Sequence, residues 1–202
     1  MPALADAVKI LPVDQASQDP KFLAVRDKLL AAVRRRDVEA VVAVAAEDIK
    51  LSFGGDYGRD QFRQRLATDD NGEGGSYWAE LEWALKLGGV FNGDHGRQFC
   101  TPYVSCTGSH QCGDCDPFET LVAVSDRAPV YATADSESAI LTHLSYDVVT
   151  LVDYGSPRQR IRLADGRIGY VAFPDFRSPI GYRAYFEKRE GRWQMRIFIA
   201  GD

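Results

Sequence analysis

The chain has 202 residues, a formal net charge of −5 and 45% hydrophobic residues, which is ordinary for a folded globular protein. This length allows one large domain or two small ones, with a core that needs no metal or disulfide. Lysine and arginine are scattered, and the one basic run, Arg34 to Arg36, fits the last turn of a helix. We therefore expect no nucleic-acid partner, which would need a basic face. We also expect no transmembrane segment, because no stretch reaches ~20 apolar residues.

The N-terminal part has the pattern of a helical domain. Residues 1–19 lack periodicity and predict a flexible arm. Asp19 followed by Pro20 then predicts a helix start, with Asp as the N-cap and Pro at the first helical position. Apolar residues continue at helical spacing to Val33, and Asp37 predicts the cap of a second helix whose apolar stripe ends at Ile49. With so short a connection, the two helices should pack antiparallel.

Two more helices are predicted before the pattern changes. A short strand at residues 50–53 and a glycine-rich turn precede a helix at residues 60–66. A stronger helix at residues 77–87 stops at Gly88-Gly89, a common helix end. We assign residues 20–97 to a helical domain and residues 98–117 to a loop that contains all four cysteines.

The C-terminal half has the pattern of a β-rich domain. Short β-like runs follow residue 118, and Asp165-Gly166 between two of them is a strong hairpin signal. A last hairpin, in residues 180–202, turns at Glu190-Gly191 and is expected to pack on the helical domain. Helices followed by strands indicate the α+β class. The runs are residues 120–124, 129–133, 148–153, 159–163, 168–173, 182–188 and 192–200.

Residues 118–179 resemble a bacterial SH3-like domain. Ala128 to Ser136 occupies the place of an early family motif, and Arg160 to Val171 fits the family's closing pair of strands around Asp165-Gly166. Gly169 would let a neighbouring strand approach closely. The resemblance implies a small β-barrel that binds cell-wall peptides, glycans or a protein partner. Its candidate groove residues are Tyr131, Tyr146, Tyr170 and Phe173.

A weaker resemblance concerns the rest of the chain. The helical pair, residues 50–58 and the terminal hairpin are similar to pieces of the cone-shaped fold of the nuclear-transport-factor-2-like (NTF2-like) class. That class packs helices on a curved sheet and holds ligands in the cavity between them. Such a cavity would be lined by Asp56, Tyr57, Trp78 and Trp83, with Asp60, Glu80 and Glu82 as further carboxylates for acid–base work. The alternative is that these carboxylates are turn, cap and solvated helix residues.

The four cysteines, Cys100, Cys106, Cys112 and Cys115, leave three explanations open. Cys112-Gly-Asp-Cys115 has the spacing of half a zinc site, with His110 nearby. Two disulfides in an oxidising compartment are the explanation we favour, and sequence cannot choose among the three connectivities. The third explanation is four reduced, inert thiols. Oxidised cysteines would indicate a periplasmic or secreted protein, and reduced ones a cytoplasmic protein.

The sequence therefore predicts a non-enzymatic binding or scaffolding protein of the bacterial cell envelope. His95, His110 and His143 fall in loop-like or turn-like stretches, so no cysteine has a positioned histidine for nucleophilic catalysis. The turn that contains Gly54, Gly55 and Gly58 does not have the lysine and the hydroxyl residue that a phosphate loop carries at fixed positions. We expect no cofactor. The alternative function is an enzyme or small-molecule binder that uses the cone-like cavity.

Overall fold

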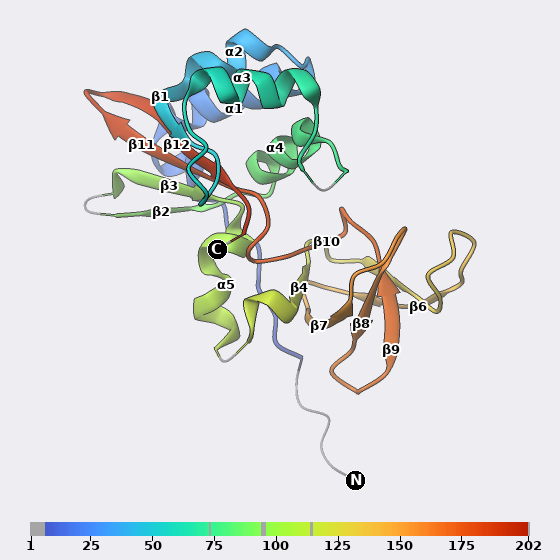
Figure 1. Ribbon diagram of the computed structural model, residues 1–202. Helices are drawn as coiled ribbons and strands as arrows, with labels where there is room; N and C mark the ends of the chain where they lie inside the picture. The colour runs from blue at the N-terminus through green and yellow to red at the C-terminus, as the bar shows by residue number, and fades with distance from the viewer. Residues whose placement is uncertain (1–6, 73, 94–95, 114, 202) are drawn as a thin grey trace. The chain divides into compact units, whose positions relative to one another are not determined.

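The computed structural model describes residues 7–72, 74–93, 96–113 and 115–201, and it divides into two compact units (Figure 1). The first, here called the helical unit, consists of Val13–Cys106 and Ile180–Asp202. The second, here called the sheet unit, consists of Met1–Pro12 and Thr107–Pro179. Separate runs of helices and antiparallel strands confirm the α+β class. Within the described ranges, no helix has both the length and the apolar character required to cross a membrane.

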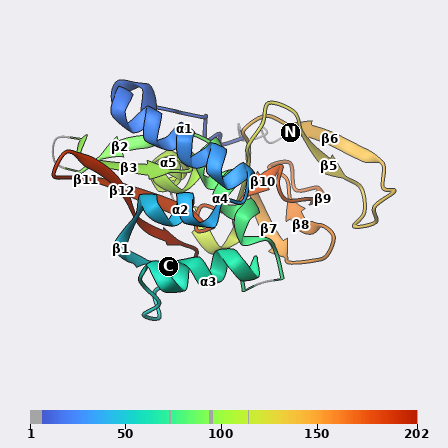
Figure 2. The ribbon, with the colours of Figure 1, turned by 90° about the horizontal axis from the view of Figure 1, so that it is seen from above.

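The helical unit packs helices on one face of a five-stranded sheet with the order β1-β12-β11-β3-β2. Strand β1 runs parallel to β12, and the other neighbours are antiparallel. In the view from above, α1 and α2 lie over this sheet (Figure 2). Its elements are η1 (Ala16–Gln18), α1 (Pro20–Arg34), α2 (Val38–Val44), β1 (Ala45–Lys50), α3 (Arg59–Thr68), α4 (Tyr77–Lys86), β2 (Val90–Asn92), β3 (Gln98–Thr101), β11 (Arg183–Arg189) and β12 (Arg192–Ile199).

Side-chain caps explain where the helices begin. The carboxylate of Asp19 accepts hydrogen bonds from the backbone N–H groups at the start of α1, which confirms the predicted cap. Asp37 caps α2 and Ser76 caps α4 in the same way. Polar side chains at these positions satisfy amide groups that have no partner inside the helix.

The core of the helical unit lies between the helices and the sheet. Phe22 of α1 is fully buried at its centre, and its ring lies 4.2 Å from that of Phe99 and 5.0 Å from that of Trp193, measured between centroids. The C-terminal hairpin contributes Phe186 and Phe198 to the same core. Aromatic pairs of this kind stabilise the fold beyond the area they bury.

The sheet unit is a seven-stranded antiparallel sheet with the order β10-β4-β7-β8-β9-β5-β6. Because β10 and β6 end the order without pairing with each other, the described strands show no closed barrel, and the predicted SH3-like barrel is not confirmed. The strands are β4 (Thr120–Ala123), β5 (Ala128–Tyr131), β6 (Ile140–Leu144), β7 (Val148–Asp153), β8 (Gln159–Arg162), β9 (Ile168–Val171) and β10 (Phe176–Arg177), preceded by the short helix η3 (Pro117–Glu119).

The predicted β8–β9 hairpin is confirmed. Gly166 has a φ of 84°, the left-handed conformation that the Asp165-Gly166 turn requires. Gly169 of β9 is buried, and a Cβ atom at this position would overlap Cγ1 of Val130 on β5. Glycine is therefore required here for the close approach of β5 and β9.

Two segments differ from their predictions. Residues 98–117, predicted as a loop, contain β3, the helix α5 (Tyr103–Cys112) and the first residue of η3. In place of a flexible arm, residues 7–19 make specific contacts: Ile10 is fully buried, and its N–H donates to the carbonyl of Tyr146. Gln15 likewise donates its N–H to the carbonyl of Gly89. These bonds are tertiary, so local composition carries no signal for them.

Candidate functional site

The structure brings two of the predicted groove tyrosines together. Tyr131 of β5 and Tyr170 of β9 are direct partners in the antiparallel register. Opposite residues in such a pair project to the same face of the sheet. Both side chains are half-buried, while Val130 and Val171 beside them point into the core. The two rings therefore belong to the solvent-facing side of the sheet unit.

Arginines of β8 extend this pair across the sheet. Arg160 lies opposite Tyr170, and Arg162 lies opposite Ile168. Both arginines are exposed, whereas Ile161 between them is fully buried. Tyr131, Arg160, Arg162 and Tyr170 thus form one surface, here called the tyrosine–arginine face.

A third arginine fixes the position of Tyr131. The guanidinium carbon of Arg158 lies 3.5 Å from the centroid of the Tyr131 ring. The same guanidinium donates hydrogen bonds to the backbone carbonyls of Asp135 and Ser136. Arg158 is buried. It therefore holds both the ring and the β5–β6 connection, and a stacked guanidinium on a phenol is a stabilising contact.

The other two predicted groove residues lie outside this face. Tyr146 is in the turn between β6 and β7 with a φ of 59°, and its N–H donates to the carbonyl of Ser125. Phe173 follows β9, is 43% exposed and has the guanidinium carbon of Arg177 5.8 Å from its ring centroid. Neither residue belongs to a strand of the sheet.

The four residues of the alternative cavity have separate environments. The indole N–H of the buried Trp78 donates to the carbonyl of Leu66 at 2.8 Å. Trp83 is half-buried, and its ring carries the ammonium of Lys86 at 4.6 Å. Tyr57 is 65% exposed.

The carboxylates near these aromatic residues form ion pairs with arginines. Asp56 pairs with Arg65 at 2.8 Å, Asp60 pairs with Arg63 at 2.7 Å, and Glu82 pairs with Arg34 at 3.0 Å. Of the histidines, His143 is exposed on β6. His95 and the side chain of His110 lie outside the described residues.

A hollow in the helical unit had no counterpart in the sequence predictions. It has a volume of about 410 Å³ and lies on the five-stranded sheet. Arg196, one of its lining residues, pairs with Asp48 and lies 3.5 Å from a carboxylate oxygen of Glu187. The hydrogen bond from Arg196 lowers the pKa of the Asp48 carboxyl despite an opposing effect of burial. The lining residues are Asp48, Lys50, Gln98, Tyr185, Phe186, Glu187, Arg196 and Ile197.

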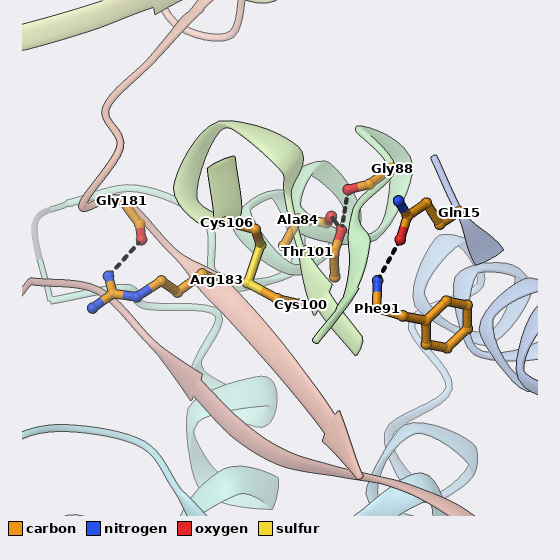
Figure 3. Close-up of a disulfide and its surroundings, with 9 residues drawn as sticks. All are labelled: Gln15, Ala84, Gly88, Phe91, Cys100, Thr101, Cys106, Gly181 and Arg183. Carbon is orange, nitrogen blue, oxygen red and sulfur yellow. Dashed lines mark hydrogen bonds between the residues drawn. A yellow bond between two sulfur atoms is a disulfide. The ribbon is translucent and has the colours of Figure 1, made fainter. Parts of the chain in front are cut away.

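The cysteines form two pairs at disulfide distance. Cys100 of β3 is joined to Cys106 of α5 with a Cα–Cα distance of 5.8 Å, and Figure 3 shows this bond beside Thr101 and Arg183. Cys112 is joined to Cys115 with a Cα–Cα distance of 5.5 Å. Both distances lie in the normal range for disulfides. Among the described residues, no His, Cys, Asp and Glu side chains gather as a metal site.

Intact-mass spectrometry tests the pairing. The protein purified without reductant should weigh about 4 Da less than its reduced form, because each disulfide removes two hydrogens. Peptide mapping should recover Cys100 with Cys106 and Cys112 with Cys115. A mass equal to that of the reduced chain, with four thiols open to alkylation, would contradict the oxidised state.

The comparisons with known proteins give only distant similarities. No protein-family model and no curated protein matches the sequence. Among solved structures, one similar protein is a protein of unknown function from Mycobacterium tuberculosis. Its sequence is 10% identical, the match covers 90% of this chain and 69% of that chain, and the TM-score is 0.32. An NTF2-like protein of unknown function from Pseudomonas putida KT2440 has 10% identity, with 93% and 87% coverage and a TM-score of 0.31. A protein of unknown function with a cystatin-like fold from Nostoc punctiforme has 11% identity, 93% coverage of both chains and a TM-score of 0.30.

Proposed function

We propose that the protein is a non-enzymatic binding or scaffolding protein of the bacterial cell envelope that engages a peptide, glycan or protein partner through the sheet unit. The observation that carries the proposal is the register pairing of Tyr131 with Tyr170 on the solvent-facing side. Paired, partly exposed phenol rings offer an apolar surface with polar tips, which suits the backbone and side chains of an extended ligand. Arg158 holds one ring in place, so little side-chain freedom is lost on binding.

Two further features support the proposal. The β8–β9 hairpin has the turn and the buried glycine on which the SH3-like resemblance rests, although the sheet is not a closed barrel. The two disulfides support a periplasmic or secreted location, since such bonds persist in oxidising compartments.

Co-sedimentation with purified peptidoglycan sacculi, together with retention on an immobilised octapeptide library, tests the proposal. We expect Tyr131→Ala and Tyr170→Ala to lower the retained fraction at least about fivefold, equivalent to about 1 kcal/mol of lost aromatic contact. Tyr154→Ala is the control, because Tyr154 is an exposed tyrosine of the same unit that lies beyond the end of β7 and outside the tyrosine–arginine face. No retention of the wild-type protein on either support, or equal losses in all three variants, would contradict the proposal.

A second candidate function concerns the helical unit. Helices on one face of a mixed sheet support an NTF2-like cone. The hollow of about 410 Å³ is a separate feature of this sheet, because most of its lining residues alternate with core residues such as Ala184 and Phe186, and it is large enough for a small polar molecule. Lys50 and Arg196 supply positive charge there, and Asp48 and Glu187 supply negative charge. This arrangement favours a small-molecule binder as the alternative to the binding protein proposed above.

A further inference from the structure

The tyrosine–arginine face carries two arginines that have no ion-pair partner among the described residues. Arg160 and Arg162 are exposed, and no carboxylate of the described residues forms an ion pair with either. By contrast, Arg34, Arg63 and Arg196 of the helical unit each have a carboxylate partner. An arginine without an internal partner presents a planar, fixed set of donors that matches a carboxylate.

The spacing of these two arginines restricts the ligand. They occupy alternate positions of β8, so their side chains leave the same face of the sheet ~6.6 Å apart. The alternate side chains of an extended peptide have the same repeat. A peptide that runs along β8 with acidic residues at alternate positions can therefore present one carboxylate to each guanidinium.

The neighbouring residues define the edges of this surface. Tyr170 and Tyr131 lie on the next two strands, at ~4.8 Å per strand, and can contact the apolar parts of the same peptide. Arg158 is excluded as a ligand residue, because it is buried and donates to two backbone carbonyls. Asp153 of β7 lies opposite Arg160 in the register, and its negative charge would repel an anion bound to Arg160.

We propose that the tyrosine–arginine face binds extended acidic peptides whose carboxylates occupy alternate positions and pair with Arg160 and Arg162. This inference rests on the proposed function and names its ligand class. Charge complementarity selects the acidic peptide: two exposed guanidinium groups without an ion-pair partner among the described residues lie on β8, and Asp153 opposite Arg160 is the carboxylate that a bound anion meets. Removing that carboxylate therefore strengthens binding.

The test uses the full-length protein and a fluorescein-labelled octapeptide of alternating Glu and Thr, with fluorescence anisotropy as the readout. The double variant Arg160→Glu, Arg162→Glu should bind at least about tenfold more weakly, and Asp153→Asn about twofold more tightly. A peptide with Gln in place of Glu should also lose about tenfold. Binding by the wild-type protein should weaken between ~0.05 M and ~0.5 M NaCl.

Arg192→Glu is the matched control, since Arg192 is exposed on β12 of the helical unit and single substitution there leaves the tyrosine–arginine face unchanged. The single variant Arg162→Glu provides the equal-charge comparison, and thermal unfolding verifies that all variants fold. An equal loss in Arg192→Glu and Arg162→Glu would overturn the proposal in favour of unspecific attraction. Tighter binding of oligogalacturonate than of the peptide would overturn it in favour of an acidic glycan.

The outcomes also separate this inference from the proposed function. If Tyr131→Ala and Tyr170→Ala reduce retention on sacculi or the octapeptide library while the arginine variants bind the acidic peptide normally, the acidic-peptide inference is wrong and the proposed function stands. If no wild-type binding occurs with any of these probes, both are wrong.

Discussion

Gly169→Ala should destabilise the sheet unit by about 2 to 3 kcal/mol, the cost of forcing extra volume into a packed interior. The added Cβ atom would overlap Cγ1 of Val130, and the shift needed to relieve this overlap separates β5 from β9. Hydrogen exchange followed by mass spectrometry should show lost amide protection in β5 and β9. Protection in β11 and β12 should stay unchanged, because these strands belong to the other compact unit.

Gly54→Ala is the control for this substitution. A Cβ atom at Gly54 would have ordinary contact with the Ser52 side chain, at 3.7 Å, and its φ is not left-handed. We expect a change within about 0.5 kcal/mol. Parallel loss of protection in both units of Gly169→Ala would show that the chain unfolds as one cooperative body. An unchanged sheet unit would show that β5 can move without cost.

Asp19→Ala should lower the free energy of unfolding of the helical unit by about 3 kcal/mol, as the loss of a helix cap and a partly buried ion pair together. The carboxylate of Asp19 accepts hydrogen bonds from the start of α1. It also accepts one from the ammonium of Lys188 at 2.9 Å and one from the indole N–H of Trp193 at 3.2 Å. One side chain thus joins the first helix to the C-terminal hairpin. Urea unfolding monitored by tryptophan fluorescence measures the loss.

The same carboxylate predicts a pH dependence. Partial burial would raise the pKa of Asp19, but hydrogen bonds from Lys188, Phe22, Trp193 and Lys21 outweigh it and lower the pKa to about 2. Its contribution is complete above the unfolded value near 3.8 and disappears as the pH falls through about 2. The free energy of unfolding of the wild-type protein should therefore exceed that of Asp19→Asn by about 2 kcal/mol at neutral pH. Near pH 2 the two free energies should differ little.

Asp27→Asn is the control, because Asp27 is exposed on α1 and lies 3.6 Å from its arginine partner. It should change stability by less than about 0.5 kcal/mol at either pH. If the stability difference between wild type and Asp19→Asn stays the same at pH 2, the ionised carboxylate of Asp19 is not the source of the stabilisation.

The parts of the fold that the sequence predicts correctly are those with local chemical signals. Asp19-Pro20 and Asp37 mark helix starts through side-chain caps, and Asp165-Gly166 marks a hairpin through its left-handed glycine. The second helix was predicted to continue to Ile49, but it ends at Val44 and the chain becomes β1. This apolar run fits either structure, and pairing with the distant β12 decides it.

The cysteine segment was missed for a related reason. Strand β3 has four residues, and its partners are β2 and the distant β11. Helix α5 contains Gly108 with Ser105, Thr107 and Ser109, all weak helix formers, so its composition resembles a loop. The Cys100–Cys106 bond ties this helix to β3, and its connectivity could not be derived from spacing.

The candidate site shows the same division between local and distant information. Tyr131 and Tyr170 were predicted as groove residues because they are aromatic. That they lie next to each other depends on the pairing of β5 with β9, which are far apart in the sequence. Arg160 and Arg162 were missed, although a signal was present. In Gln159-Arg-Ile-Arg162 the two arginines alternate with residues that become buried, and alternation places them on one side of a strand.

The pairing of β3 with β11 has a consequence for how this chain could be rearranged. Thr101 near the end of β3 and Ala184 near the start of β11 are opposite each other in the ladder, although the whole of Thr107–Pro179 separates them in sequence. The larger segment of the sheet unit, Thr107–Pro179, thus occupies the position of a hairpin loop in the helical unit, while its other segment, Met1–Pro12, precedes that unit in the chain. Replacing the larger segment with a short turn would keep all five strands of the sheet in the helical unit. In chain order, most of the sheet unit is therefore an insertion at a single site of the helical unit.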